Sequence, residues 1–378
     1  MRVADLTTDR GEWGEMTRAR LCFVTAVPMT VTAFLNAHIE RLADDFEVFV
    51  VSDFSGDENG VSPRATRIQV SIPREISVGR DVAGLLALIR TFRRHRFDIV
   101  HSITPKAGLL SVSAGFLARV PVRIHWFTGQ VWATRRGPAR TALKCADRLL
   151  AGLATHLLAD SRSQRDFLVS EGICPARRIG VLGDGSICGV DGRRFRPDAE
   201  ARRALRAERE IPDDADVVLF VGRLNADKGL RELAQAMLRL DREFPSTHWL
   251  LVGPDEGGME AHVRGVASTL GRRLHFPGPT REPERFMAAA DVFCVPSHRE
   301  GFGISVLEAA AAGVPGVATR IYGLTDAVED EGTGLLVPPR DPAALADAIA
   351  ALLRDPARRR AMGTAARERA LRSFSSER

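Results

Sequence analysis

The chain has 378 residues with 45% hydrophobic and 27% charged content, which is the composition of a globular protein long enough for two domains. No apolar run reaches the roughly 18 residues of a membrane span, and the five scattered cysteines, with neither a signal peptide nor C-x-x-C spacing, favour a reducing cytoplasm. The net charge of +5 favours small anionic partners or an anionic membrane face over nucleic acid, because the basic residues are not interleaved with aromatic ones.

In the first half of the chain, short apolar runs alternate with helical patterns. Residues 1–20 are polar and charged and predict a flexible N-terminal extension. Strands are expected at 21–26, 46–51, 98–101, 123–126, 155–159 and 179–181, with helices at 31–43 and 81–95. This alternation predicts a parallel sheet with helices on both faces.

The pattern breaks at residues 183–212, which are Gly-rich and then charged, as in a connection between domains. It restarts with strands expected at 217–221, 248–252, 274–276, 292–295 and 314–318 and helices at 228–244 and 341–353. The predicted fold class is therefore α/β, with two doubly wound Rossmann-like domains, 21–195 and 196–378, facing across a cleft. Ligands of such domains lie at the carboxyl ends of the strands.

The most informative stretch is 296–316, which reads P-S-H-R-E-G-F-G-I-S-V-L-E-A-A-A-A-G-V-P-G. A buried strand is expected before it, and a Gly-rich turn leads into a helix beginning near Gly303. The free N–H groups and positive dipole end of such a helix favour a phosphate. Glu300 and Glu308, with seven residues between them, suit sugar hydroxyls instead. A buried turn with solvated glutamates is the alternative.

A second motif is the loop after the strand at 217–221, where Arg223 and Lys228 precede a helix. An arginine can grip a diphosphate with two N–H groups, and a lysine adds a compact charge. The glycine spacing is not that of a P-loop, and an ordinary capped loop remains open.

Two motifs in the first half follow strand ends. Lys106 lies in T-P-K-A-G after the strand at 98–101, and His125 begins H-W-F-T-G-Q-V-W. Both positions predict side chains at the cleft. A solvated lysine at a helix start and a structural histidine are the alternatives.

Together, Arg223 with Lys228 and Glu300 with Glu308 resemble the motifs of retaining GT-B glycosyltransferases of family 4, over nearly the whole chain from about Leu21. T-P-K-A-G, H-W-F-T-G-Q-V-W and L-A-D-S are similar to bacterial capsule and O-antigen transferases. Those enzymes move a sugar from a nucleotide donor to a polyprenyl-diphosphate-linked saccharide.

The resemblance implies a role for each matched residue. Glu300 would contact the transferred sugar, and His125 would touch it from the opposite domain. The other implied contacts are Arg223 and Lys228 with the diphosphate and leaving phosphate, Glu308 with ribose hydroxyls, the Gly303, Ile304 and Ser305 amides with the diphosphate, and Lys106 and Thr128 with the acceptor. Neither a metal nor another cofactor is expected, because the two cations replace the metal held elsewhere by a D-x-D motif.

The chain departs from the family pattern at three places. Ala26-Val27-Pro28-Met29-Thr30 stands where many relatives carry two glycines, and Cys188-Gly189-Val190-Asp191 stands where N-G-V-D is frequent. In relatives, a helix that follows the position of Arg378 crosses back to the first domain.

The function implied is transfer of a sugar with retained configuration from an NDP-sugar, with UDP-HexNAc suggested by likeness alone, to a lipid-linked saccharide in surface polysaccharide biosynthesis. Trp132 with the cations Arg135, Arg136, Arg140 and Lys144 predicts a basic surface for peripheral contact with the inner face of the membrane, or else a solvated helix with a core stripe. The alternative functions are a soluble tailoring transferase for a small natural product and a non-catalytic protein that binds sugar nucleotides.

Overall fold

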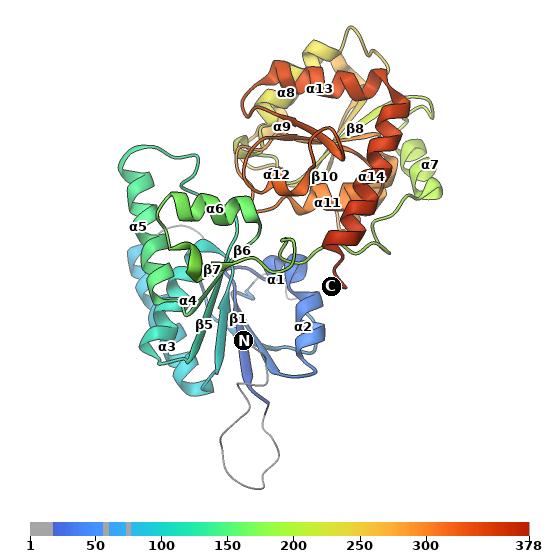
Figure 1. Ribbon diagram of the computed structural model, residues 1–378. Coiled ribbons are helices and arrows are strands. Elements are labelled where there is room, and N and C mark those ends of the chain that lie inside the picture. Colours follow the sequence, from blue (N-terminus) through green and yellow to red (C-terminus); the bar gives the residue numbers. More distant parts are fainter. Residues whose placement is uncertain (1–17, 56–59, 73–76, 378) are drawn as a thin grey trace.

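The computed structural model describes residues 18–55, 60–72 and 77–377, and it contains two α/β domains, one above the other in Figure 1. Most of the predicted N-terminal extension, 1–20, lies outside the described residues, and Arg20 already begins the first strand.

The first domain is built on a parallel sheet with the strand order β3-β2-β1-β4-β5-β6-β7. Its strands are β1 (Arg20–Val24), β2 (Glu47–Ser52), β3 (Thr66–Gln69), β4 (Ile99–Ser102), β5 (Val122–Phe127), β6 (His156–Ala159) and β7 (Ile179–Gly180). Its helices are α1 (Pro28–Phe34), α2 (Asn36–Leu42), α3 (Val78–His95), α4 (Pro105–Leu117), α5 (Gly137–Leu153) and α6 (Arg162–Ser170), with a 3₁₀ turn η2 (Ala176–Arg178).

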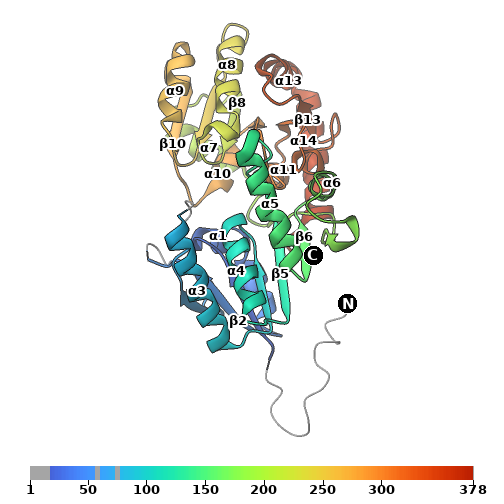
Figure 2. The same ribbon diagram turned by 90° about the vertical axis from the view of Figure 1, so that its left-hand side faces the viewer.

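The central strands of this sheet are apolar on both faces, as expected for parallel strands covered from both sides. In β1, Phe23 packs toward α1 and α2, whereas Cys22 packs toward α3 and α4. Figure 2 shows α3, α4 and α5 side by side along one face. The sheet therefore holds its strand ends, including those of β4, β5 and β6, in one rigid row.

The single helix expected at 31–43 is instead two helices. Pro28 begins α1 in its first turn, where its missing N–H costs no hydrogen bond. The chain turns at Leu35, whose side chain is buried and whose backbone lies between the two helices (φ −115°, ψ −17°). The turn lets both short helices lay an apolar side chain on the sheet.

The second domain has a parallel sheet with the strand order β10-β9-β8-β11-β12-β13. Its strands are β8 (Val217–Val221), β9 (His248–Val252), β10 (Leu274–Gly278), β11 (Val292–Val295), β12 (Gly316–Thr319) and β13 (Gly334–Val337). Its helices are α7 (Ala199–Glu208), α8 (Leu230–Leu240), α9 (Met259–Val266), α10 (Pro283–Ala289), α11 (Ile304–Ala311), α12 (Leu324–Ala327), α13 (Pro342–Arg354) and α14 (Pro356–Phe374), with 3₁₀ turns η3 (Ala226–Lys228) and η4 (Ser268–Arg273).

The connection expected at 183–212 contains the helix α7, which belongs to the second domain. Its Arg206 is buried and pairs with Asp291 at the start of β11 (Nη2–Oδ2 2.8 Å). Phe195, before α7, already packs into the same core. The strongly charged sequence of this segment is therefore partly structural, because Arg206 also donates hydrogen bonds to the carbonyls of the loop that follows.

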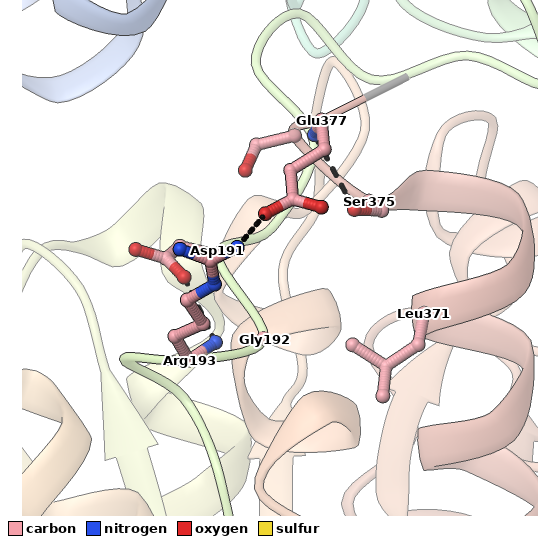
Figure 3. A pocket seen from close by; sticks show the side chains of 7 residues that line it. Asp191, Gly192, Arg193, Leu371, Ser375 and Glu377 are labelled. Atoms are coloured by element: carbon pink, nitrogen blue, oxygen red, sulfur yellow. Dashed lines mark hydrogen bonds and ion pairs between the residues drawn. The ribbon is translucent and has the colours of Figure 1, made fainter.

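The last helix, α14, returns to this connection. The Val190 N–H donates to the Phe374 carbonyl (2.8 Å), and the Ser376 N–H donates to the Val190 carbonyl (3.0 Å). A small cavity of about 160 Å³ lies at this junction, where Arg193 pairs with Glu377 across from Leu371 (Figure 3). The end of the helix is thus tied to the segment that joins the domains.

Candidate active site

The turn after β11 has the geometry expected of a phosphate-binding helix start. Gly303 precedes α11 with a left-handed backbone (φ 88°), and a Cβ there would lie 2.5 Å from Leu324. Glycine is required at this position for both reasons. The Ile304 and Ser305 amides open the helix, where N–H groups have no partner within the helix itself. The helix N-terminus expected here is therefore present, with Gly303 buried and Ile304 and Ser305 partly exposed, and its binding of a phosphate stays a prediction.

The two motifs of the second domain meet at this turn. Lys228 Nζ lies 2.6 Å from Glu300 Oε1, with side chains that are 21% and 15% exposed. The contact is possible because Gly229 packs against the Pro296 carbonyl, so closely that a Cβ would lie 1.9 Å from that oxygen. Residues 72 positions apart are thus held as one ion pair at the carboxyl ends of β8 and β11.

A serine that the sequence analysis did not single out orients this pair. The buried Ser297 hydroxyl donates to Glu300 Oε1 (2.8 Å), the same oxygen that Lys228 contacts. Thr319 on β12 in turn donates to the Ser297 carbonyl. Two donors on one oxygen fix the carboxylate and leave Oε2 for another partner. The serine lies two residues after a buried strand, which is the signal that could have identified it.

Arg223 does not join the Lys228–Glu300 pair. Its guanidinium contacts Glu256 (Nη1–Oε2 2.9 Å), which also accepts from Asn225 (3.0 Å). The Arg223 side chain is about half exposed. The structure thus places the two predicted phosphate cations on one loop but with different carboxylate partners.

Glu308 lies one turn into α11 in a different environment from Glu300. Among the described residues its carboxyl group has no hydrogen-bond or ion-pair partner, and Glu308 is only partly exposed. Burial raises the pKa of Glu308 to about 7, against the attraction of Arg194 and with a smaller contribution from Glu284. An unpartnered carboxyl group beside a helix N-terminus can accept hydrogen bonds from ligand hydroxyls.

The position of His125 differs from the prediction. Its side chain is 1% exposed, its Nδ1 lies 2.9 Å from the Ser102 hydroxyl, and it packs against Gly108 of α4. Burial lowers its pKa to about 3, so the imidazole is neutral. A histidine enclosed between β4 and α4 cannot touch a donor sugar in this arrangement, and the expected role is not supported. The His125 side chain points from β5 to the face of the sheet that α4 covers.

Thr128 and Gly129, three and four residues later, are the part of this motif that meets the second domain. A Cβ on Gly129 would lie 3.2 Å from the Glu300 carbonyl carbon and from the Gly301 nitrogen. A Cβ on Gly301 would lie 3.3 Å from Thr128 Cα. The predicted acceptor residue Thr128 is therefore beside the predicted catalytic loop.

The other predicted acceptor residue, Lys106, pairs with Asp81 on α3 (Nζ–Oδ1 2.5 Å). Their side chains are about one-fifth exposed. The ion pair joins the first turns of α3 and α4. It neutralises the lysine in this state.

Asp160, at the end of β6 in the L-A-D-S motif, is a further acidic group at this contact. It is 3% exposed, and its Oδ2 would lie 2.5 Å from a Cβ on Gly301. Burial raises the pKa of Asp160 to about 7, against the effect of the Trp126 indole, and the charge of Glu300 raises it further. A carboxyl group directly after a buried strand was the available signal.

The basic surface predicted around Trp132 is largely neutralised. Trp132 is buried, and Arg140 and Lys144 both contact Glu171 (2.7 and 2.6 Å) while lying over the indole ring. These three side chains therefore contact one another and Glu171, whereas Arg135 and Arg136 are exposed, and membrane contact at this helix stays a prediction.

Two further findings concern what the described residues could hold. Within the described ranges, no three His, Cys, Asp or Glu side chains are grouped as metal ligands would be. Metal independence stays a prediction. In the same ranges, none of the helices has the length and apolar character needed to cross a bilayer.

The chain has two Rossmann-like domains that face each other, with the α11 N-terminus and the Lys228–Glu300 pair where they meet. This arrangement is that of the GT-B class of glycosyltransferase. Family models agree: residues 201–369 match "Glycosyl transferases group 1", and residues 30–185 match "Glycosyl transferase 4-like domain". The chain belongs to the family 4 GT-B glycosyltransferases and resembles capsule enzymes among them.

Relatives and solved structures support this assignment. The chain is 29% identical to the capsular polysaccharide biosynthesis glycosyltransferase CapM of Staphylococcus aureus over 82% of this chain and 81% of the relative. It is 37% identical to a D-inositol 3-phosphate glycosyltransferase of Kineococcus radiotolerans over 76% and 71%. Similar folds include sucrose-phosphate synthase of Thermosynechococcus elongatus (TM-score 0.78, 24% identity, 95% and 96% covered) and Anabaena HepE with UDP and glucose (0.79, 21%, 95% and 96%).

Proposed function

We propose that this glycosyltransferase moves a sugar from an NDP-sugar to a lipid-linked saccharide in surface polysaccharide assembly, at the cytoplasmic face of the membrane. The observation that carries the proposal is the Lys228–Glu300 pair, fixed by Ser297 at the start of α11. The likeness to CapM supports the saccharide acceptor, and the likeness to HepE with UDP supports a uridine donor. A UDP-HexNAc is the donor we favour.

In this reaction the bond from the anomeric carbon to the diphosphate breaks, and negative charge develops on the departing NDP. The α11 amides and Lys228 are placed to stabilise that charge, which is the largest catalytic effect expected of such a site. The free oxygen of Glu300 would accept from a hydroxyl of the transferred sugar, and Glu308 from the ribose. Arg223 would exchange Glu256 for a phosphate oxygen.

The proposal includes retention of configuration without a metal, which rests on the family likeness and is compatible with the same groups. The acceptor hydroxyl attacks from the side on which the diphosphate leaves, and its proton passes to the leaving phosphate oxygen. No enzyme base is needed on the opposite face. Asp160 and Thr128 lie on the first-domain side, where the acceptor would approach.

The test is a thermal-shift panel of nucleotides and NDP-sugars on the wild type, Lys228→Ala and Glu308→Ala. A ligand that binds only the folded state raises the melting temperature. We expect one NDP-sugar to stabilise the wild type and both variants to lose most of that shift. Lys144→Ala is the matched control, because it removes another lysine–glutamate pair in the first domain. A folded wild type that responds to none of the nucleotides would refute the donor site.

A second acceptor class is favoured by a specific observation. The relatives of 36 to 41% identity are named for inositol 3-phosphate, a small soluble acceptor. Transfer to an inositol phosphate in the absence of lipid, with none to a lipid-linked saccharide, would establish this second function. Binding of the donor without transfer to either acceptor would indicate a non-catalytic protein.

A further inference from the structure

Helix α3 is apolar on the side that faces away from the domain. Residues 82–89 read V-A-G-L-L-A-L-I, eight apolar residues that cover every side of the helix. A helix that is apolar all round is normally enclosed on all sides. In α3 only the side with Gly84, Leu88 and Phe92 is buried in the domain.

The outer side forms a continuous stripe. Val78, Val82 and Leu86 are 78%, 51% and 45% exposed, and their spacing of four residues places them one above another. Phe116 and Leu117, at the end of α4, are also about half exposed. Leu117 lies beside the last turns of α3, because its carbonyl accepts from Arg93 (3.5 Å).

The same helix carries uncompensated positive charge. Arg80, Arg90, Arg93 and Arg94 are exposed, and none of them pairs with a carboxylate among the residues that the structure describes. The one acidic residue on α3, Asp81, is already paired with Lys106. The outer face therefore combines an apolar stripe with arginines and offers no free carboxylate.

We propose that the outer face of α3 (Val78, Val82, Leu86, Arg90 and Arg94) docks on an anionic lipid bilayer. An apolar stripe bordered by cations is the pattern of helices that lie in the membrane interface. A second copy that packs through its own α3 fits less well, because that face would bring the same arginines and no free carboxylate to meet them. This inference deepens the function proposed above by naming the surface that meets the membrane.

Docking through α3 also determines which part of the first domain faces the membrane. The Lys106–Asp81 pair joins the first turns of α3 and α4, so the predicted acceptor lysine lies beside the apolar end of the stripe. A lipid-linked saccharide held at the membrane surface would then reach the first domain near Lys106. The second domain, with α11, lies above the first domain in Figure 2.

The test is co-sedimentation of the full chain with vesicles of neutral phosphatidylcholine, with and without anionic phosphatidylglycerol. We expect binding to the anionic vesicles only, falling with added salt. Leu86→Glu and Arg94→Glu should each lower the bound fraction by about fivefold or more. Leu238→Glu is the matched control, because Leu238 is 46% exposed on α8 of the second domain, and it should bind like the wild type.

Equal binding of the α3 variants and the wild type would overturn the proposal, as would absence of binding to anionic vesicles. A wild-type dimer in sedimentation equilibrium that Leu86→Glu dissociates would also overturn it, in favour of a second copy. Melting temperatures of the variants establish that they are folded. Vesicle binding needs no turnover, so loss of NDP-sugar binding with vesicle binding retained would refute the proposed function and leave this inference standing.

Discussion

At the scale of single residues, the two glutamates of the α11 motif have different environments. Glu300 is fixed through one oxygen by Lys228 and Ser297. Glu308 has no such partner in the described chain, and burial raises its pKa to about 7. Glu308 is therefore the carboxyl group of this pair whose charge changes near neutral pH.

We expect the affinity for an NDP-sugar to rise as the pH rises through about 7, because the ionised Glu308 accepts hydrogen bonds from ribose hydroxyls more strongly. Glu308→Gln should lower the affinity at pH 8 by about tenfold and abolish this pH dependence. Isothermal titration calorimetry with the NDP-sugar measures both effects. Glu368→Gln, an exposed change on α14, is the control that should keep the wild-type profile. An unchanged profile in Glu308→Gln would contradict the assignment.

The raised pKa of Glu308 also affects the free energy of unfolding, which falls with pH where the affinity for the sugar nucleotide rises. Folded Glu308 keeps its proton up to about pH 7, whereas a glutamate in an unfolded chain loses it near 4.3. The contribution of this group to the free energy of unfolding is therefore full below about pH 4 and falls as the pH rises toward 7. The site is thus less stable in the state in which it binds sugar hydroxyls best.

Sequence reasoning singled out Lys228 and Glu300 because each follows a strand end in a loop with an unusual residue pattern, and Glu308 because it lies in the helix that the second loop opens. It missed Ser297, which donates to Glu300 within the loop before α11, and Asp160, which lies against Gly301 of that loop from the first domain. It misplaced His125, because the sequence shows that a residue ends a strand but not which face of the sheet is covered.

At the scale of elements, two glycine loops bring the domains together. Gly129, after β5, lies against the backbone at Glu300 and Gly301, and Asp160 closes the other side of Gly301. The Gly323 backbone packs on the Gly301 carbonyl from within the second domain. Side chains at these positions would separate the loops.

Gly301→Ala should hinder this contact without unfolding either domain. Its Cβ would lie 2.5 Å from Asp160 Oδ2, closer than real Cβ contacts, and 3.0 Å from the Gly129 nitrogen, tighter than most of them. We expect kcat to fall about tenfold or more, which corresponds to about 1.4 kcal/mol of transition-state stabilisation. Gly265→Ala, which meets nothing within 4 Å, is the control and should leave kcat unchanged.

The elements themselves were predictable where burial is complete. β8, β9 and β11 are continuous apolar runs, and their predicted bounds match the structure. The edge strand β3 (T-R-I-Q) is mostly exposed and has no apolar run to mark it. Helix α7 was predicted to be part of the connection between the domains because its sequence is strongly charged. The sequence alone does not show that one of its arginines, Arg206, is buried and paired with Asp291.

At the scale of the whole molecule, a second contact between the domains lies beside the glycine loops. Tyr322, the one tyrosine of the chain, stacks on Phe167 of α6 (ring centroids 4.4 Å apart), and its hydroxyl accepts from the Gln130 N–H (3.2 Å). Ser163 accepts from the Gly323 N–H (2.8 Å) and donates to Asp326. Helices α6 and α12 therefore meet across the domain boundary (Figure 1).

This contact could not be predicted from the sequence, because its partners are 155 or more positions apart and carry no shared motif. The fold of each domain follows from local periodicity, whereas the angle between two domains depends on a few side chains at their surfaces. The sequence therefore predicts the class of the protein more readily than the angle between its two domains.

Tyr322 can report opening of the cleft. Burial raises its pKa to about 12, against the effect of the Gln130 N–H, while an exposed tyrosine titrates near 10. After a rapid jump to about pH 11, between these values, phenolate should form only as fast as the domains separate, and the absorbance of the single tyrosine measures that rate. Ser163→Ala, which removes one hydrogen-bonding group of the contact, should speed the step, and a bound NDP-sugar should slow it. Immediate ionisation of wild-type Tyr322, in protein that stays folded at this pH, would mean that the contact is open in solution.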